Sequence, residues 1–232
     1  MQLSAACAGV RTLTAEIALS GRAGRQKLRG RVVAGFARPA SMRLEGLAPF
    51  GAPAFILAAR GEDAVLLLPR DARVLRGAKP EDILGALTGV ALGSADLQAI
   101  LTGCVVPEPQ AIDARRHANG WASIDLSGGA TLFLEPVRGK PVAGGLSGPP
   151  DWQIRAARRA GWRIEYPAWS GSFPQSVRLQ SDQPAPMVDL TATLSQIETN
   201  KNLESAAFTV NVPPGAEPIT LDELRDSGPL GQ

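Results

Sequence analysis

Residues 79–103 form the one clearly helical segment of a chain that is otherwise patterned like a β protein. Pro80 suits a first helical position, and the acidic residues after it place negative charge at the positive end of a helix. Apolar residues recur at helical spacing on both sides of Gly89 and Gly93, and Ser94 can cap the second run. We therefore predict two short amphipathic helices. Neither is stable alone, so both must lie on the flanking strands, either as a plug of a β core or as a lid over an apolar cavity.

The composition suits one large β domain with many turns. The chain has 232 residues, of which 44% are hydrophobic, with 25 glycines and 19 prolines. We predict a single domain over residues 1–212 and a largely irregular C-terminal tail over residues 213–232. The net charge of +2 argues against a dedicated nucleic-acid-binding protein.

The first residues carry a helical pattern. Val10, Leu13 and Ile17 recur at helical spacing, which predicts an amphipathic helix over residues 5–19 that ends near Gly21 and packs on the sheet.

From Leu28 onward the apolar residues alternate with a period of two, as in strands. The first two runs predict an antiparallel pair, and Asn119-Gly120 later marks a hairpin turn. Residues 138–150, rich in Gly and Pro, predict a long surface loop. The strands are expected over residues 28–36, 42–47, 54–60, 64–68, around 74–75, 111–118, 121–126, 131–137, 152–159, 162–169, 176–180, 187–197 and 207–212. An antiparallel sheet with this many strands is large enough to curl into an incomplete, half-open β-barrel, and we predict such a barrel with an N-terminal helix and short lid helices.

Small residues on the inner face of this sheet leave volume inside it. Gly30, Ala34 and Gly46 all fall on the alternating face that we expect to point inward. If the two short helices cover that volume without filling it, the result is a pocket suited to acyl chains.

Residues for catalysis or metal binding are scarce. His117 is the only histidine and stands beside two arginines, which does not suit a general base. We find no phosphate-binding loop, nucleophile elbow or metal-spaced cluster. Cys7 and Cys104 are the only cysteines, which excludes a Cys-rich metal site and leaves open whether the two pair. We expect a non-enzymatic protein without a metal or cofactor, in which the four tryptophans belong to the core rather than to a sugar site.

A cluster of basic residues lies near the start of the chain, at Arg22, Arg25, Lys27, Arg29 and Arg31. The alternation of the last three favours a solvated strand face over attraction to an anionic membrane.

The runs MRLEGLAPFGAPAFILAARGEDAVLLLP and ILGALTGVALGSADLQAILTG resemble the outer-membrane lipoprotein receptor family of the Lol system (LolB-like) and related envelope lipoproteins of the LolA/LolB fold. The resemblance covers about residues 28–103. It implies an incomplete β-barrel with a helical lid, whose cavity holds the acyl chains of lipoproteins. Phe50, in a turn too small to bury it, can lie in the core or in solvent, and the resemblance favours an exposed, membrane-contacting position.

The resemblance further implies a protein at the periplasmic face of the outer membrane that helps localise lipoproteins there and receives them from a periplasmic carrier. A lipid anchor on a cysteine upstream of Met1 is expected as well. The alternative is an envelope lipoprotein that acts as a structural or protein-interaction module with a filled core. The residues expected to line an acyl-chain cavity are all apolar and come from the strands and the two helices: Val32, Phe36, Leu44, Phe55, Leu57, Leu66, Leu68, Ile83, Leu87, Leu97, Ile100 and Leu101.

Overall fold

The computed structural model describes residues 9–104, 110–137, 151–159, 161–183 and 187–227. In this part of the chain every strand belongs to one sheet, in the order β14-β6-β5-β4-β3-β2-β1-β13-β12-β11-β10-β9-β8-β7. The strands are β1 (Thr12–Ala23), β2 (Gln26–Ala37), β3 (Ser41–Leu47), β4 (Phe55–Arg60), β5 (Asp63–Leu68), β6 (Arg73–Ala78), β7 (Ala111–Arg116), β8 (Ala122–Leu126), β9 (Thr131–Val137), β10 (Asp151–Arg159), β11 (Trp162–Ser170), β12 (Phe173–Ser181), β13 (Val188–Thr199) and β14 (Glu217–Pro218). The helices are α2 (Pro80–Thr88), α3 (Ser94–Thr102), α4 (Leu221–Asp226) and the 3-10 helix η1 (Ser205–Phe208).

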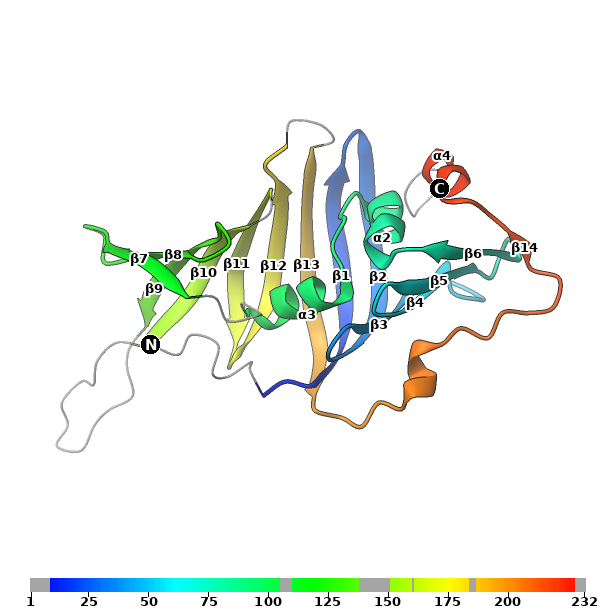
Figure 1. The fold of residues 1–232 in the computed structure, drawn as a ribbon, viewed down its shortest axis with the longest axis horizontal. Coiled ribbons are helices and arrows are strands. Elements are labelled where there is room, and N and C mark those ends of the chain that lie inside the picture. Colours follow the sequence, from blue (N-terminus) through cyan, green and yellow to red (C-terminus); the bar gives the residue numbers. More distant parts are fainter. Residues whose placement is uncertain (1–8, 105–109, 138–150, 160, 184–186, 228–232) are drawn as a thin grey trace.

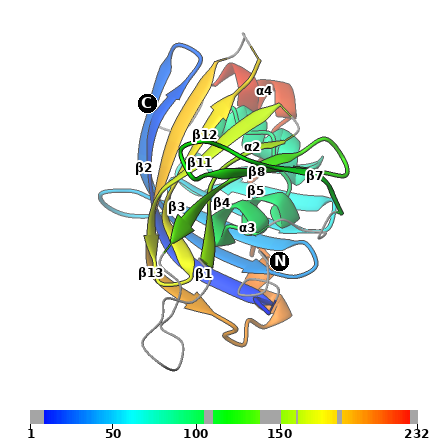
Figure 2. The same cartoon turned by 90° about the vertical axis from the view of Figure 1, so that its left-hand side faces the viewer.

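The sheet curves around α2 and α3 and stays open (Figures 1 and 2). Its two edge strands, β7 and β14, do not pair with each other. Neighbouring strands pair antiparallel, except that β14 runs parallel to β6. The predicted architecture, mainly β with one curled, half-open sheet and short helices on it, is confirmed. We call the face under α2 and α3 the inner face and the opposite one the outer face.

The N-terminal helix predicted over residues 5–19 is wrong for the described residues, because Thr12–Ala23 form strand β1. Leu13 and Ile17 are four residues apart, which fits a helix face, but the even spacing also places them on one strand face. Pairing along the whole of β1 with β2 on one side and β13 on the other decides between the two. Long-range hydrogen bonding thus overrides the local pattern.

The C-terminal segment also differs from the prediction. The strand predicted over residues 207–212 is wrong, because residues 207–208 belong to the 3-10 helix η1 and residues 209–212 form no strand. The tail over residues 213–232, expected to be largely irregular, contains β14 and α4. Arg43 on the outer face donates hydrogen bonds to the carbonyl oxygens of Ala207 (3.2 Å) and Thr209 (2.7 Å). The segment therefore crosses the outer face of β3 and β4 before it joins the sheet edge at β6.

The two central helices lie where the sequence places them. Pro80 is at the start of α2, and Gly89 and Gly103 end α2 and α3 in the left-handed conformation, with φ of 76° and 68°. Ser94 does not cap α3, because the cap residue is Gly93 and Ser94 is already helical and buried. No helix in the described ranges has the length and hydropathy needed to cross a membrane. The loop predicted over residues 138–150 lies outside the described residues.

Candidate functional site

The candidate site is the inner face of the sheet together with the two helices that cover it. All twelve residues predicted to line a cavity belong to, or pack against, one continuous apolar cluster. Ile83 and Leu87 of α2 and Ile100 of α3 are almost fully buried, as are Leu57 and Leu66 on the strands beneath. Val32, Leu68 and Leu97 are partly buried at its margin. The structure therefore brings the predicted residues together, in a closed arrangement.

The space expected above the small inward residues is partly occupied. An added Cβ atom at Gly46 would lie 2.2 Å from the ring of Phe55, the residue opposite it on β4. The space next to Gly46, where we expected volume for a ligand, is thus filled by an aromatic ring. The space next to Ala34 is also closed, because Ala34 is buried in the cluster. An acyl chain can reach this face only if the helices or side chains move.

A small cavity of about 10 Å³ remains between α3 and strands β9–β11. Its wall includes Ile100, Leu132, Ile154, Ile164 and Tyr166. Its volume is close to the minimum for a single water molecule. The closed protein thus has a defect in its packing under α3, too small for any chain.

Tyr166 places a phenol in this apolar region. Burial raises the pKa of Tyr166 well above its usual range, and the nearby Arg159 guanidinium opposes that shift. Folding therefore favours the neutral phenol. Its contribution to stability is fully present below the pKa of an unfolded tyrosine, about 10, and is lost as the pH rises through the higher folded value.

We expect the free energy of unfolding, measured by urea denaturation, to fall as the pH is raised above about 10. The fall should be smaller in Tyr166→Phe, which keeps the ring and removes the titrating group. Tyr166 is the only tyrosine of the chain, so its ionisation can be followed by absorbance in the same samples. An equal decline in both proteins would contradict the assignment of the buried phenol.

Two buried polar atoms lie at the two ends of α3. Ser94 Oγ, in its first turn, and Trp169 Nε1 have no hydrogen-bond partner among the described residues. Trp169 stands at the other end of α3, because an added Cβ at Gly103 would lie 2.5 Å from its ring. A buried polar group without a partner costs about 1–3 kcal/mol. For Ser94, which belongs to α3 itself, movement of the helix into water would relieve this cost.

A salt bridge ties α3 to the sheet. Arg159 Nη2 on β10 lies 2.5 Å from Asp96 Oδ1 in the first turn of α3. Both side chains are partly exposed, so the pair contributes little to stability and can be broken and re-formed in water.

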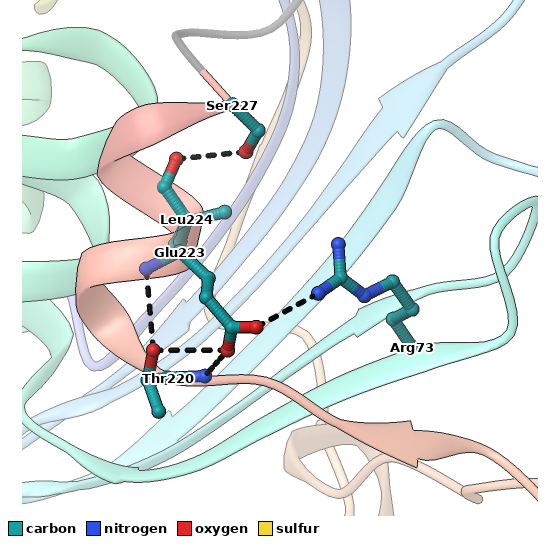
Figure 3. A network of polar contacts seen from close by, with 5 residues as sticks. All are labelled: Arg73, Thr220, Glu223, Leu224 and Ser227. Carbon is teal, nitrogen blue, oxygen red and sulfur yellow. Dashed lines mark hydrogen bonds and ion pairs between the residues drawn. The ribbon is translucent and has the colours of Figure 1, made fainter.

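The C-terminal segment adds a third helix to the site (Figure 3). Helix α4 packs against α2, and Leu224 and Ile219 belong to the same apolar cluster as the inner face. Thr220 and Glu223 form a capping box: the Thr220 N–H donates to Glu223 Oε2 at 2.7 Å, and the Glu223 N–H donates to Thr220 Oγ1 at 3.2 Å. Arg73 of β6 lies 3.5 Å from Glu223 Oε1. We call β14 and α4 together the C-terminal clasp.

The clasp residues were missed by the sequence analysis. The spacing of Thr220 and Glu223 before an apolar residue, Leu224, is the sequence signature of a capping box and could have revealed α4. The hydrogen bond from the Thr220 N–H lowers the pKa of Glu223, so the capping box needs the ionised carboxylate and weakens on acidification.

Phe50 lies in the loop between β3 and β4 and is 87% exposed. Arg70 fixes this loop, because its guanidinium donates hydrogen bonds to the carbonyl oxygens of Phe50 (2.6 Å) and Ala52 (3.3 Å). The aromatic ring is therefore presented to solvent on a loop that the neighbouring β5–β6 turn holds in place.

The described residues offer no grouping of three or more His, Cys, Asp or Glu side chains that could hold a metal ion. His117 is exposed, with its Nε2 atom 3.0 Å from Ser123 Oγ. Trp152 packs on the core and carries the Arg116 guanidinium 5.5 Å from its ring centre. Cys104 is buried and disulfide-bonded, and Cys7 lies outside the described residues.

The fold has counterparts among solved structures, although no family model and no curated protein sequence matches the chain. A LolA superfamily protein from Nitrosomonas europaea has a TM-score of 0.56 at 9% identity, over 87% of this chain and 91% of that one. A DUF1329 family protein from Desulfovibrio piger has a TM-score of 0.53 at 10% identity, over 87% and 90%. These likenesses show a fold of the LolA/LolB type without singling out the outer-membrane receptor.

Proposed function

We propose that this protein binds the acyl chains of lipids or lipoproteins on the inner face of its sheet, after α2 and α3 move aside. The observation that carries the proposal is a continuous apolar surface on a half-open sheet that, in the described part of the chain, is covered by two nine-residue helices and the short clasp helix α4. Helices of this length have little stability of their own and depend on the surface beneath them. An acyl chain offers that surface the same kind of contact, so the chain and the helices compete for it.

Three features of the described residues support opening at this place. The first turn of α3 holds a buried hydroxyl group without a partner, the packing defect lies beneath α3, and α3 is tied to the sheet by a partly exposed salt bridge. Affinity for an acyl chain is then set by the apolar area that the chain buries and by the free energy of opening. The fold shared with a LolA superfamily protein is compatible with such a role.

The proposal extends to where the protein works. We place it in the bacterial envelope, facing the periplasm at the outer membrane, as a lipid-anchored protein that receives lipoproteins from a periplasmic carrier and helps localise them. In this scheme the exposed Phe50 contacts the membrane when cargo is delivered. Inserting one aromatic side chain into the membrane contributes roughly 1.5–3 kcal/mol of binding free energy, which is enough for transient binding to the membrane.

We expect Phe50→Ser to slow the transfer of a bound acylated peptide to phospholipid vesicles by about tenfold or more, because the anchoring ring is lost. Uptake of the peptide and the free energy of unfolding should not change, since the ring is not buried. Ile112→Ser, on β7, is a matched control, because Ile112 is also an exposed apolar residue at 72%. Equal transfer rates in all three proteins would remove Phe50 from the delivery step.

One alternative is favoured by a specific observation. The closed packing of the inner face suits an envelope protein-interaction module with a filled core. Such a module takes up no acylated peptide under any condition, whereas the proposed carrier does, so a peptide-uptake assay separates the two.

A further inference from the structure

The hairpin of β1 and β2 presents a cluster of positive charge. Arg22 on β1 is directly opposite Lys27 on β2, and Arg29 follows two residues along the same face. Like charges placed opposite each other destabilise a sheet. Arg25 lies in the turn between the strands, and all four side chains are exposed.

The acidic groups on the same face do not neutralise this cluster. Asp189 is opposite Arg22 on β13, but it accepts two hydrogen bonds from Arg178 at 2.8 and 2.6 Å. Glu16 Oε1 on β1 lies 3.2 Å from Nη1 of Arg31, which is farther from the turn on β2. Arg22, Arg25, Lys27 and Arg29 have no carboxylate partner among the described residues. The hairpin is therefore an unneutralised cationic surface, rather than a ladder of ion pairs.

Exposed apolar side chains lie beside the hairpin turn and farther along the same face of β2 and β3. Leu47 is opposite Arg31 on the neighbouring strand, and Val33 follows Arg31 on the same face of β2. Gly24, in the hairpin turn, donates its N–H to the Met187 carbonyl oxygen at 2.8 Å, which places the exposed Met187 beside the turn. Phe50 follows Leu47 by three residues, in a loop that projects outward on the side of the sheet where β2 lies (Figure 2).

These side chains make up four of the five large apolar residues that are exposed in the described part of the chain. Only Ile112 lies elsewhere, on β7. Apolar groups interspersed with unpaired cations are the pattern of a surface that lies at the interface of an anionic bilayer. A soluble polyanion would match the charges and leave the apolar residues without a role.

We infer that the β1–β2 hairpin and the adjoining Val33, Leu47, Phe50 and Met187 form one surface that docks on membranes containing anionic phospholipid. The inference deepens the proposed function, because it names the lipid chemistry of the membrane at which the protein delivers its cargo. The cations supply long-range attraction to lipid phosphates, and Phe50 inserts once the hairpin has docked.

The test is cosedimentation of the full chain with two kinds of vesicle, one of phosphatidylcholine and one that also contains phosphatidylglycerol. We expect strong binding to the second kind, weak binding to the first, and loss of binding as salt is raised. Lys27→Gln combined with Arg29→Gln should weaken binding by roughly twenty-fivefold, at about fivefold for each cation near the surface. The matched control combines Arg76→Gln with Arg158→Gln, which removes the same charge from exposed positions on β6 and β10.

Each outcome separates this inference from its rivals. Equal losses in the two double variants, or equal binding to the two kinds of vesicle, would overturn it. Heparin binding without vesicle binding would assign the surface to a soluble polyanion instead. Acylated-peptide uptake, measured on the same proteins, keeps the proposed function separate, because the hairpin variants should retain uptake. If the wild-type protein takes up acylated peptide but does not bind the anionic vesicles, only this inference is overturned. If it binds the vesicles but takes up no peptide, only the proposed function is overturned.

Discussion

Leu224→Ala is expected to raise the affinity of the protein for an acylated peptide by about tenfold or more. Leu224 is 2% exposed and joins the clasp helix α4 to the cluster that holds α2 on the sheet. Truncating a buried leucine to alanine costs about 2–5 kcal/mol of packing. Because this packing is present in the closed state, its loss lowers the free energy needed to open the lid. Each 1.4 kcal/mol by which opening becomes easier raises the apparent affinity for the peptide about tenfold. Fluorescence titration with a labelled acylated peptide measures the change.

A matched substitution separates opening of the lid from general loss of stability. Leu134→Ala removes the same atoms from a fully buried position on β9, on the far half of the sheet from α2 and α4. Both variants should have a lower free energy of unfolding in urea, by about 2–5 kcal/mol. Only Leu224→Ala should bind the peptide more tightly. Unchanged or weaker binding in Leu224→Ala would show that the clasp does not restrain the lid.

Locking α2 to the sheet is expected to abolish acyl uptake. An added Cβ at Gly89, which ends α2, would lie 3.0 Å from the Cβ of Ala23 on β1. That separation is within about an ångström of the Cβ spacing in a disulfide. The double variant Ala23→Cys and Gly89→Cys should therefore form a bond that prevents the end of α2 from leaving the sheet. In its oxidised form, uptake of acylated peptide should fall to background, because the inner face stays covered.

Reduction of the engineered bond should restore uptake. Gly89 has a φ of 76°, and a cysteine there loses about 1–2 kcal/mol to left-handed strain, so the single variant Gly89→Cys serves as the reference for stability. The reductant also acts on the disulfide of Cys104, so the wild-type protein is measured with and without it. Full uptake by the oxidised double variant would mean that α2 is not part of the lid.

The sequence predicted the central part of the fold because its signals there are local. Pro80 begins α2, and Gly89 and Gly103 end the two helices in a conformation that favours glycine. Strands β4, β5, β9, β10 and β11 follow from alternation between turn residues, and their predicted bounds agree with the structure to within about two residues. The prediction succeeds where the sequence contains both the turn residues that bound an element and the periodic apolar residues within it.

The failures occur where partners distant in sequence decide the structure. The four-residue spacing of Leu13 and Ile17 suits a helix, and only pairing with β2 and β13 makes the segment a strand. Residues 209–212 have strand character, but the nearest strands already have partners and Arg43 holds the preceding carbonyls on the outer face. Predicting the clasp required both the capping box at Thr220 and knowledge that the edge of β6 was free.

The sequence predicted which residues make up the candidate site, but it did not predict how their side chains pack. Alternation and helical spacing identify which residues face inward, so nine of the twelve predicted residues belong to one cluster and the other three pack against it. The spacing of apolar residues does not specify the direction in which a large side chain points. The ring of Phe55, for example, occupies the space next to Gly46. Whether the inner face is hollow or filled therefore depends on side-chain packing, which the pattern of apolar residues does not determine.

Native mass spectrometry of the wild-type protein mixed with an acylated peptide tests the central claim, that the inner face receives acyl chains when the helices move. We predict an added mass equal to the peptide in the native spectrum, absent from the denatured spectrum of the same sample. The same peptide without its acyl chain should add no mass. Identical native and denatured masses for the wild-type protein and for Leu224→Ala, after incubation with the acylated peptide, would contradict the claim and leave α2 and α3 as permanent parts of a filled core.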